Sequence, residues 1–129
     1  MKSTSVSLCV GRYMVCHGSQ GDDVHRVCVV SADGALLASY GGPRGSDADQ
    51  LDFPRHLASL GDCGVLVADF NNRRVILLSP TLHVVSEISD QLLDFSPYRL
   101  CVDERMCVLF VGGLIRGSSD VGRLAAFDI

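Results

Sequence analysis

Short apolar runs separated by turn-forming residues recur along the chain, and this pattern constrains the fold more than any other feature. The runs are rich in β-branched residues and are bounded by Gly, Asp, Asn, Ser or Pro. They read VHRVCVVS, ALLASY, GVLVAD, RVILLS, LHVVSEI, MCVLFVGG and GRLAAFDI. Such segments are typical of β-strands, whereas the periodicity of an amphipathic helix is hard to find anywhere. The sequence therefore predicts an all-β protein.

The connections between runs carry the chemistry of tight turns. SADGAL, from Ser31 to Leu36, places an Asp-Gly pair between two apolar runs, and glycine supplies the positive φ that hairpin turns need. SPTL, from Ser79 to Leu82, occupies the corresponding place further along. Both segments predict hairpins, and GGPRGSD, from Gly41 to Asp47, predicts a link between two units.

The runs also repeat at a regular spacing. Pro97 follows Pro54 by 43 residues, and the same alignment matches Leu66-Val67 with Leu109-Phe110. Arg74 follows Arg26 by 48 residues, and Gly122-Arg123-Leu124 repeats the same arginine-to-apolar step. Repeats of this size, with about four short strands each, are typical of β-propeller blades. We expect three units, about 5–40, 54–90 and 97–129, the last without its outer strand.

Composition narrows the class of protein. The 129 residues are 47% hydrophobic with a mean hydropathy of +0.27, the profile of a packed domain. The net charge of −4 gives no excess of cations for DNA or an anionic membrane, and no run is long enough to span a bilayer. The N-terminal apolar residues are too interrupted for a signal peptide, so a cytoplasmic protein is expected.

The six cysteines have no CxxC spacing, which argues against a zinc ribbon and favours free thiols. Five of them lie in apolar runs and are expected to be buried: Cys9, Cys16, Cys28, Cys101 and Cys107. Cys16 and His17 point to opposite faces of a strand, so convergence with His25 and Cys28 on a metal is disfavoured. The sequence predicts neither a metal site nor a cofactor.

The DFNNRR segment, from Asp69 to Arg74, separates two runs that both require burial. We interpret it as the tight connection between two inner strands. Asp69 and Asn72 are suited to hydrogen bonds with the turn backbone, and Arg74 is placed to pair with a carboxylate. His17 and Gly112 are expected to occupy the position of Asp69 in the other two units. This reading makes the segment mainly architectural.

VADFNNRRV, preceded by LDFPRHLAS, resembles the NHL repeat, and the chain is similar to the C-terminal propeller of tripartite-motif (TRIM) NHL proteins. The resemblance implies an open, partial NHL-type propeller of about three blades whose structural motif is Pro54, Asp69, Asn72, Arg74 and Pro97. Because such propellers generally close with about six blades, three suggest a fragment or a half-ring that pairs with another copy. Open blades expose apolar faces and strand edges, so self-association is expected. Ubiquitin transfer in this family requires a RING domain, which nothing here matches.

The resemblance further implies a non-catalytic scaffold that presents blade turns to a protein partner. The candidate partner-binding residues are the polar side chains of corresponding turns: His17, Asp22, His25, Arg26, Asp69, Asn71, Asn72 and Arg73. The alternative for each is a solvated turn residue that only holds a hairpin together. Two other functions stay open: a metal-dependent propeller lyase or hydrolase, and RNA binding, which the neighbouring aspartates disfavour.

Overall fold

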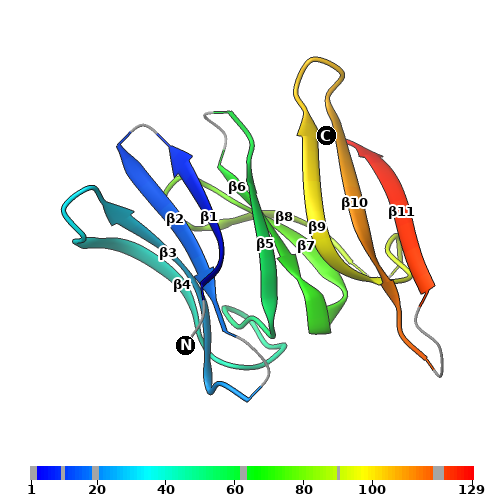
Figure 1. Ribbon diagram of the computed structural model, residues 1–129, viewed down its shortest axis with the longest axis horizontal. Helices are drawn as coiled ribbons and strands as arrows, with labels where there is room; N and C mark the ends of the chain where they lie inside the picture. The colour runs from blue at the N-terminus through cyan, green and yellow to red at the C-terminus, as the bar shows by residue number, and fades with distance from the viewer. Residues whose placement is uncertain (1–2, 10, 19–20, 62–63, 90, 118–120) are drawn as a thin grey trace.

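The structure is a computed structural model that describes residues 3–9, 11–18, 21–61, 64–89, 91–117 and 121–129, and its regular structure is almost entirely β-strand. Within these residues, the strands form three antiparallel sheets (Figure 1). Each sheet is a simple meander, because strands that are adjacent in sequence are also hydrogen-bonded neighbours. The prediction of an all-β protein is confirmed.

The three sheets follow one another along the chain. Sheet 1 contains β1 (Ser3–Cys9), β2 (Arg12–His17), β3 (Val24–Ser31) and β4 (Leu36–Pro43). Sheet 2 contains β5 (Pro54–Ser59), β6 (Val65–Asp69), β7 (Arg74–Leu78) and β8 (Val84–Ile88), with the short 3-10 helix η1 (Phe70–Asn72) between β6 and β7. Sheet 3 contains β9 (Ser96–Asp103), β10 (Val108–Ile115) and β11 (Val121–Asp128). Among the described residues, the first two sheets thus have four strands each and the third has three.

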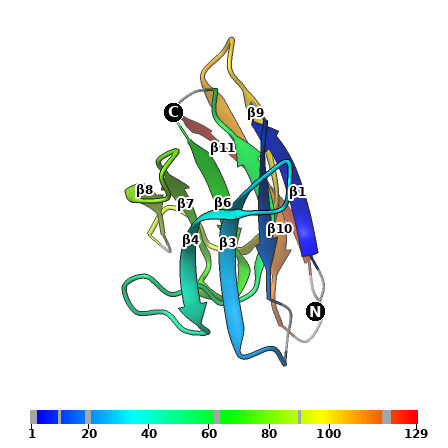
Figure 2. The ribbon, with the colours of Figure 1, turned by 90° about the vertical axis from the view of Figure 1, so that its left-hand side faces the viewer.

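The sheets stack face to face, with their first strands in the middle of the assembly. β5 contacts β1 on one side and β9 on the other, so that sheet 2 lies between sheets 1 and 3 (Figure 1). Figure 2 looks from the side of sheet 1, where β1 and β4 form opposite edges of that sheet. Sheets 1 and 3 therefore each pack against a neighbour on one face only within the chain.

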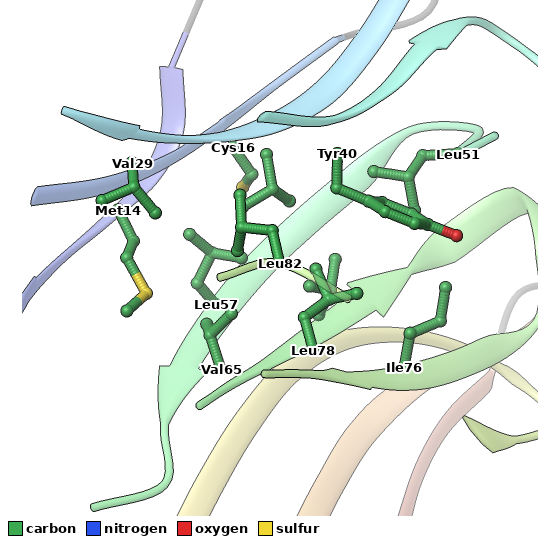
Figure 3. Packing of buried hydrophobic residues seen from close by; sticks show 12 residues of the cluster. Met14, Cys16, Val29, Tyr40, Leu51, Leu57, Val65, Ile76, Leu78 and Leu82 are labelled. Carbon is green, nitrogen blue, oxygen red and sulfur yellow. The ribbon is translucent and has the colours of Figure 1, made fainter. Parts of the chain in front are cut away.

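Two apolar layers hold the stack together. The layer between sheets 1 and 2, drawn in Figure 3, consists of Met14, Cys16, Val27, Val29, Tyr40, Leu51, Leu57, Val65, Val67, Ile76, Leu78 and Leu82. The layer between sheets 2 and 3 consists of Leu66, Ala68, Val75, Leu93, Phe95, Leu100, Leu109 and Val111. Because burying one large aliphatic side chain contributes about 1.5–3 kcal/mol, these layers are the main source of stability. Neighbouring residues of β6 alternate between the layers, as the period of a strand requires.

The same irregularity occurs at the start of every sheet. The pairing of β5 with β6 skips one residue between Pro54 and His56. The pairing of β9 with β10 skips one residue between Pro97, which faces Gly113, and Arg99, which faces Gly112. The pairing of β1 with β2 skips between Ser3 and Ser5. A bulge adds twist and turns a side chain out of the regular alternation. The residues left over in sheets 2 and 3 are Arg55 and Tyr98.

The strand register aligns sheet 2 with sheet 3. On the second strands, β6 and β10, this alignment differs by one residue from the alignment expected from the sequence. Leu57 faces Val67 across β5 and β6, and Leu100 faces Val111 across β9 and β10. Val67 therefore corresponds to Val111, not to Phe110, and the matching of Leu66 with Leu109 was wrong. The sequence alignment failed because the hairpin between β9 and β10 is one residue longer than that between β5 and β6, which a search at a constant offset cannot detect.

Both predicted hairpins are present. Ser31 and Ala35 bond across the first turn, where Gly34 has φ +88°, and Ser79 and His83 bond across the second. In each turn the serine Oγ also accepts a backbone N–H, from Ala35 at 3.1 Å and from His83 at 3.0 Å. The two turns thus use the same serine chemistry in sheets 1 and 2.

The prediction for the cysteines is correct only for one pair. Cys16 and Cys28 are buried free thiols, whereas Cys101 and Cys107 are exposed. Cys101 lies on the face of sheet 3 that no other sheet covers, and Cys107 lies in the hairpin before β10. The side chains of Cys9 and Cys63 lie outside the described residues. Among those residues, no helix has the length and apolar character needed to cross a membrane.

Candidate interaction surface

One end of the stack collects the connections that carry polar side chains. In an antiparallel meander the second strand of each sheet ends where the first and third begin, and the fourth strand returns to that same end. β2, β6 and β10 therefore end beside the starts of β5 and β9 (Figure 1, lower end). We call this end of the stack the turn face. All eight residues predicted from the sequence as a partner surface lie at or next to it.

Asp69 is the centre of the turn face in sheet 2. It is fully buried, and its carboxylate accepts hydrogen bonds from Arg74 Nε at 2.7 Å, Asn72 Nδ2 at 2.8 Å and the backbone N–H of Asp52 at 2.8 Å. Burial raises the pKa of Asp69, while the bonds from Asn72, the Asp52 backbone and Arg74 act in the opposite direction. Charge-assisted bonds of this kind contribute about 1.5–3 kcal/mol each, which offsets part of the cost of burying the charge.

The same cluster fastens the connection between sheets 1 and 2. Arg74 donates through Nη2 to the carbonyl of Gln50 at 2.7 Å, and Asn72 donates to the carbonyl of Gly45 at 3.0 Å. The predicted pairing of Arg74 with a carboxylate is confirmed, and its partner is Asp69. The expected bonds from Asp69 and Asn72 to the backbone of their own turn were wrong, because both side chains bond instead to the backbone of the preceding connection. DFNNRR therefore binds sheet 2 to the segment that leads into it.

Sheets 1 and 3 carry modified versions of this pair. His17 faces Arg26 across β2 and β3, and Arg26 Nε donates to His17 Nε2 at 2.7 Å. In sheet 3 the register places Gly113, not the expected Gly112, opposite Arg123. Arg123 lies 3.9 Å from the carboxylate of Asp94. An arginine at the start of the third strand is thus common to all three sheets, while its partner changes.

Local geometry explains why the sheet 3 position holds a glycine. A Cβ on Gly113 would overlap the ring of Phe95 and the carbonyl oxygen of Ser96. Phe95 therefore fills the space that the Asp69 side chain occupies in sheet 2. In sheet 1 the imidazole of His17 is half-buried, and its Nδ1 makes no hydrogen bond within the described residues. Burial is the main reason that the pKa of His17 is lowered, and the nearby Arg26 lowers it further.

Two other histidines connect neighbouring sheets. His25 is fully buried, and its Nδ1 accepts the backbone N–H of Phe53 at 2.7 Å while its Nε2 donates to the carbonyl of Asp22 at 2.9 Å. His56 Nδ1 accepts the backbone N–H of Leu100 at 3.0 Å. Burial lowers the pKa of His56, and Arg99 adds to this effect. The structure thus places His25 inside the stack, not on an accessible surface.

Arginine and aromatic side chains cover the part of the turn face between sheets 2 and 3. The guanidinium carbon of Arg55 lies 5.0 Å from the ring centroids of both Phe53 and Phe70, and 5.5 Å from that of Tyr98. Arg116 approaches the ring of Phe70 from a different position, at 5.4 Å. Cation–π contacts of this type contribute about 0.5–2 kcal/mol and hold the planar groups in place. Arg55 and Tyr98 are the two bulge residues, which a search for period-two alternation does not single out.

A shallow groove of about 200 Å³ runs beside this cluster. It is lined by Asn71, Arg73, Asp94, Phe95, Ser96, Leu114, Ile115 and Arg116. Asn71 spans its edge, because its Nδ2 donates to Asp52 Oδ1 at 2.9 Å and its Oδ1 accepts from Arg116 Nη1 at 3.1 Å. Arg73 is exposed and has a left-handed backbone with φ +51°, which turns the chain out of η1. Asn71 and Arg73 are therefore the predicted residues that a partner can reach.

The eight predicted residues divide by exposure. His25 and Asp69 are buried, whereas His17, Asp22, Arg26 and Asn72 are half-buried and Asn71 and Arg73 are exposed. Pro54 and Pro97, predicted as part of the structural motif, are buried next to the bulges. Within the described ranges, no three His, Cys, Asp or Glu side chains gather closely enough to hold a metal ion.

No family model matches the chain, and no curated protein matches it significantly.

Proposed function

We propose that the chain is a non-catalytic interaction module, built as part of an NHL-type β-propeller, that binds a protein partner on its turn face. Three observations support the propeller interpretation. In every sheet the strands are paired in the order in which they follow one another along the chain, the first strands of neighbouring sheets are in contact, and the first strand of each sheet begins with the same bulge. In a propeller the first strands of the blades line the central channel. The bulge residues Arg55 and Tyr98 would then lie near one mouth of that channel.

The observation that carries the functional proposal is the groove between sheets 2 and 3. Its lining combines the apolar side chains of Phe95, Leu114 and Ile115 with the two cations of Arg73 and Arg116 and the single carboxylate of Asp94. Interfaces between proteins are enriched in arginine and in aromatic residues. The hydrogen bonds of Asn71 and the stacking of Arg55 fix one side of the groove before any partner arrives, which lowers the entropy lost on binding. We infer a partner segment that has a carboxylate next to an apolar side chain.

The exposed free thiols of Cys101 and Cys107 fit a reducing compartment, so the proposal includes a cytoplasmic location.

The test uses the purified chain immobilised on a resin and exposed to a cell extract. The turn-face variant carries Asn71→Ala and Arg73→Glu, and the control carries Val85→Asp on β8, where the side chain is 59% exposed and does not line the groove. We expect a defined set of proteins to be retained by the original chain and the control but lost with the turn-face variant. An unchanged retained set would remove the groove from consideration as the binding surface.

RNA is a second candidate ligand, because arginines stacked on aromatic rings are also found where single-stranded nucleic acids bind. Asp52 and Asp94 at the same location oppose it. Treating the extract with ribonuclease before capture separates the two ligands. Retention that survives the treatment supports a direct protein contact, and loss of the whole set would favour RNA.

A further inference from the structure

Each sheet has two faces, and the register assigns every strand residue to one of them. We call the face toward the next sheet in the chain the forward face and the opposite one the backward face. The forward face of sheet 1 packs on the backward face of sheet 2, and the forward face of sheet 2 packs on the backward face of sheet 3. Both contacts inside the molecule thus join a forward face to a backward face.

The forward face of sheet 3 retains the apolar side chains of a packed face although no sheet covers it. The register matches Leu66, Ala68, Val75 and Leu77 of sheet 2 with Phe110, Gly112, Leu124 and Ala126 of sheet 3. In sheet 2, Leu66 and Val75 are 3% and 1% exposed, whereas Phe110 and Leu124 of sheet 3 are 38% and 71% exposed. A strand face that is meant for water normally alternates to polar residues. None of these four positions of sheet 3 holds a charged or hydroxyl side chain. The charged residues of the same face lie around them, with Arg99 opposite Gly112 and with Asp103 and Asp128 opposite Val108 at the end of the strands.

The backward face of sheet 1 shows the complementary pattern. Val65, Val67, Ile76 and Leu78 of sheet 2 correspond in register to Tyr13, Val15, Cys28 and Val30 of sheet 1. The sheet 2 residues are at most 1% exposed, because sheet 1 covers them. Tyr13 is 38% exposed, Val15 and Val30 are half-buried, and Cys28 is 5% exposed. Figure 2 is viewed from this side of the molecule.

The chain therefore has one forward face and one backward face left over, at opposite ends of the stack (Figure 1). These two faces cannot meet within one molecule while sheet 2 separates sheets 1 and 3. At the register positions that form the two contacts inside the molecule, each of these faces carries aromatic and aliphatic side chains: Phe110 with Leu124 on sheet 3, and Tyr13 with Val15 and Val30 on sheet 1. We propose that the forward face of sheet 3 binds the backward face of sheet 1 in a second copy of this chain, head to tail.

This contact is heterologous, since two different surfaces of the protein meet. If the rotation between copies allows both pairs of faces to join, two copies close a ring; otherwise the same contact produces longer assemblies. The proposal does not depend on the groove of the turn face, which lies at the ends of the strands.

Two substitutions block the two faces separately. Leu124→Asp places a charge in the centre of the forward face of sheet 3, and Tyr13→Asp does the same on the backward face of sheet 1. Both side chains are exposed in the single chain, so neither change should disrupt its packing. Ala126→Asp and Tyr13→Ser serve as second variants if circular dichroism shows that either protein is unfolded. Leu92→Asp is the control, because Leu92 is 70% exposed in the connection between sheets 2 and 3 and belongs to neither face.

Sedimentation velocity measures the assembly state of each protein and of mixtures. We expect the original chain and Leu92→Asp to associate, and Leu124→Asp and Tyr13→Asp to be monomeric when studied alone. A mixture of the two monomeric variants should form a heterodimer, since one partner still has an intact forward face and the other an intact backward face. This heterodimer should be weaker than the original assembly if that assembly is a ring with two contacts.

Three outcomes would overturn the proposal. A monomeric original chain at all accessible concentrations means that something other than a second copy covers these faces. Association that persists in either single variant means that the copies meet elsewhere. If both variants are monomeric but their mixture does not pair, the contact is not head to tail.

Discussion

Arg74 Nε lies 2.7 Å from the buried carboxylate of Asp69, and in sheet 1 Arg26 Nε lies at the same distance from the imidazole of His17. The two pairs occupy equivalent register positions, yet only the first joins opposite charges. Sheet 2 therefore has a buried ion pair where sheet 1 has a hydrogen bond to an aromatic nitrogen.

We predict that Asp69→Ala lowers the free energy of unfolding by about 3–5 kcal/mol, because it leaves Arg74, Asn72 and the Asp52 backbone without their acceptor. For a domain whose total stability is about 5–15 kcal/mol this is a severe loss. Urea denaturation followed by circular dichroism measures it. Arg74→Ala and the double variant complete a cycle, whose coupling energy should be about 1–3 kcal/mol.

Arg26→Ala is the matched control for that cycle. It removes an arginine at the same register position, but its partner is a histidine whose pKa is lowered, so no ion pair is lost. Its destabilisation should be clearly smaller than that of Arg74→Ala. Equal losses at the two positions would show that the arginines act through packing alone.

A second prediction concerns acid stability. The pKa values of His17 and His56 are both lowered from the ordinary value of 6.5, chiefly by burial and also by Arg26 and Arg99 respectively. The unfolded chain then binds these protons at a higher pH than the folded chain does. Their stabilising contribution is complete above pH 6.5 and is lost as the pH falls through the folded pKa values.

The free energy of unfolding should therefore decrease between pH 7.5 and pH 5.5. His56→Asn keeps an acceptor for the Leu100 N–H but cannot be protonated in this range, so its curve should fall less steeply than that of the original chain. The raised pKa of Asp69 has the opposite sign, because its contribution is complete below pH 3.8 and is lost as the pH rises through the folded value. A His56→Asn curve parallel to the original one would exclude His56 as a source of the slope.

Particular residues show how far the sequence determined these features. The apolar runs and the Asp-Gly turn at Gly34 were sufficient to place the sheets, since strand and hairpin signals are local. The pairing of Arg74 with a carboxylate was also local, because both residues flank one turn. The burial of His25 and the stacking of Arg55 were not predictable, since each depends on a residue from another strand or connection. Arg55 in addition lies at a bulge, where the alternation that guides sequence reasoning is interrupted.

The third prediction tests the close packing at the end of sheet 3. Gly113→Ala should destabilise the protein by about 1–3 kcal/mol, because the added Cβ would overlap Phe95 and the Ser96 carbonyl oxygen and force the backbone to shift. Gly122→Ala on β11 is the control, since a Cβ there meets nothing within 4 Å. Thermal unfolding of the two variants compares them directly. Equal midpoints would mean that the contact with Phe95 relaxes without cost.

The last prediction concerns the thiols. Cys101 and Cys107 are exposed and should react with a thiol reagent in the folded protein, whereas Cys16 and Cys28 should react only after denaturation. Burial is the main cause that raises the pKa of Cys28, which reduces its reactive thiolate fraction further. Peptide mapping after brief labelling identifies the modified positions.

Because Cys101 lies on the forward face of sheet 3, the proposed head-to-tail contact should slow its labelling in the assembled protein. Leu124→Asp should restore the rate at Cys101 and leave that at Cys107, in the hairpin, much less affected. If Cys101 is labelled at the same rate in the original chain and in Leu124→Asp, the forward face of sheet 3 stays open in solution.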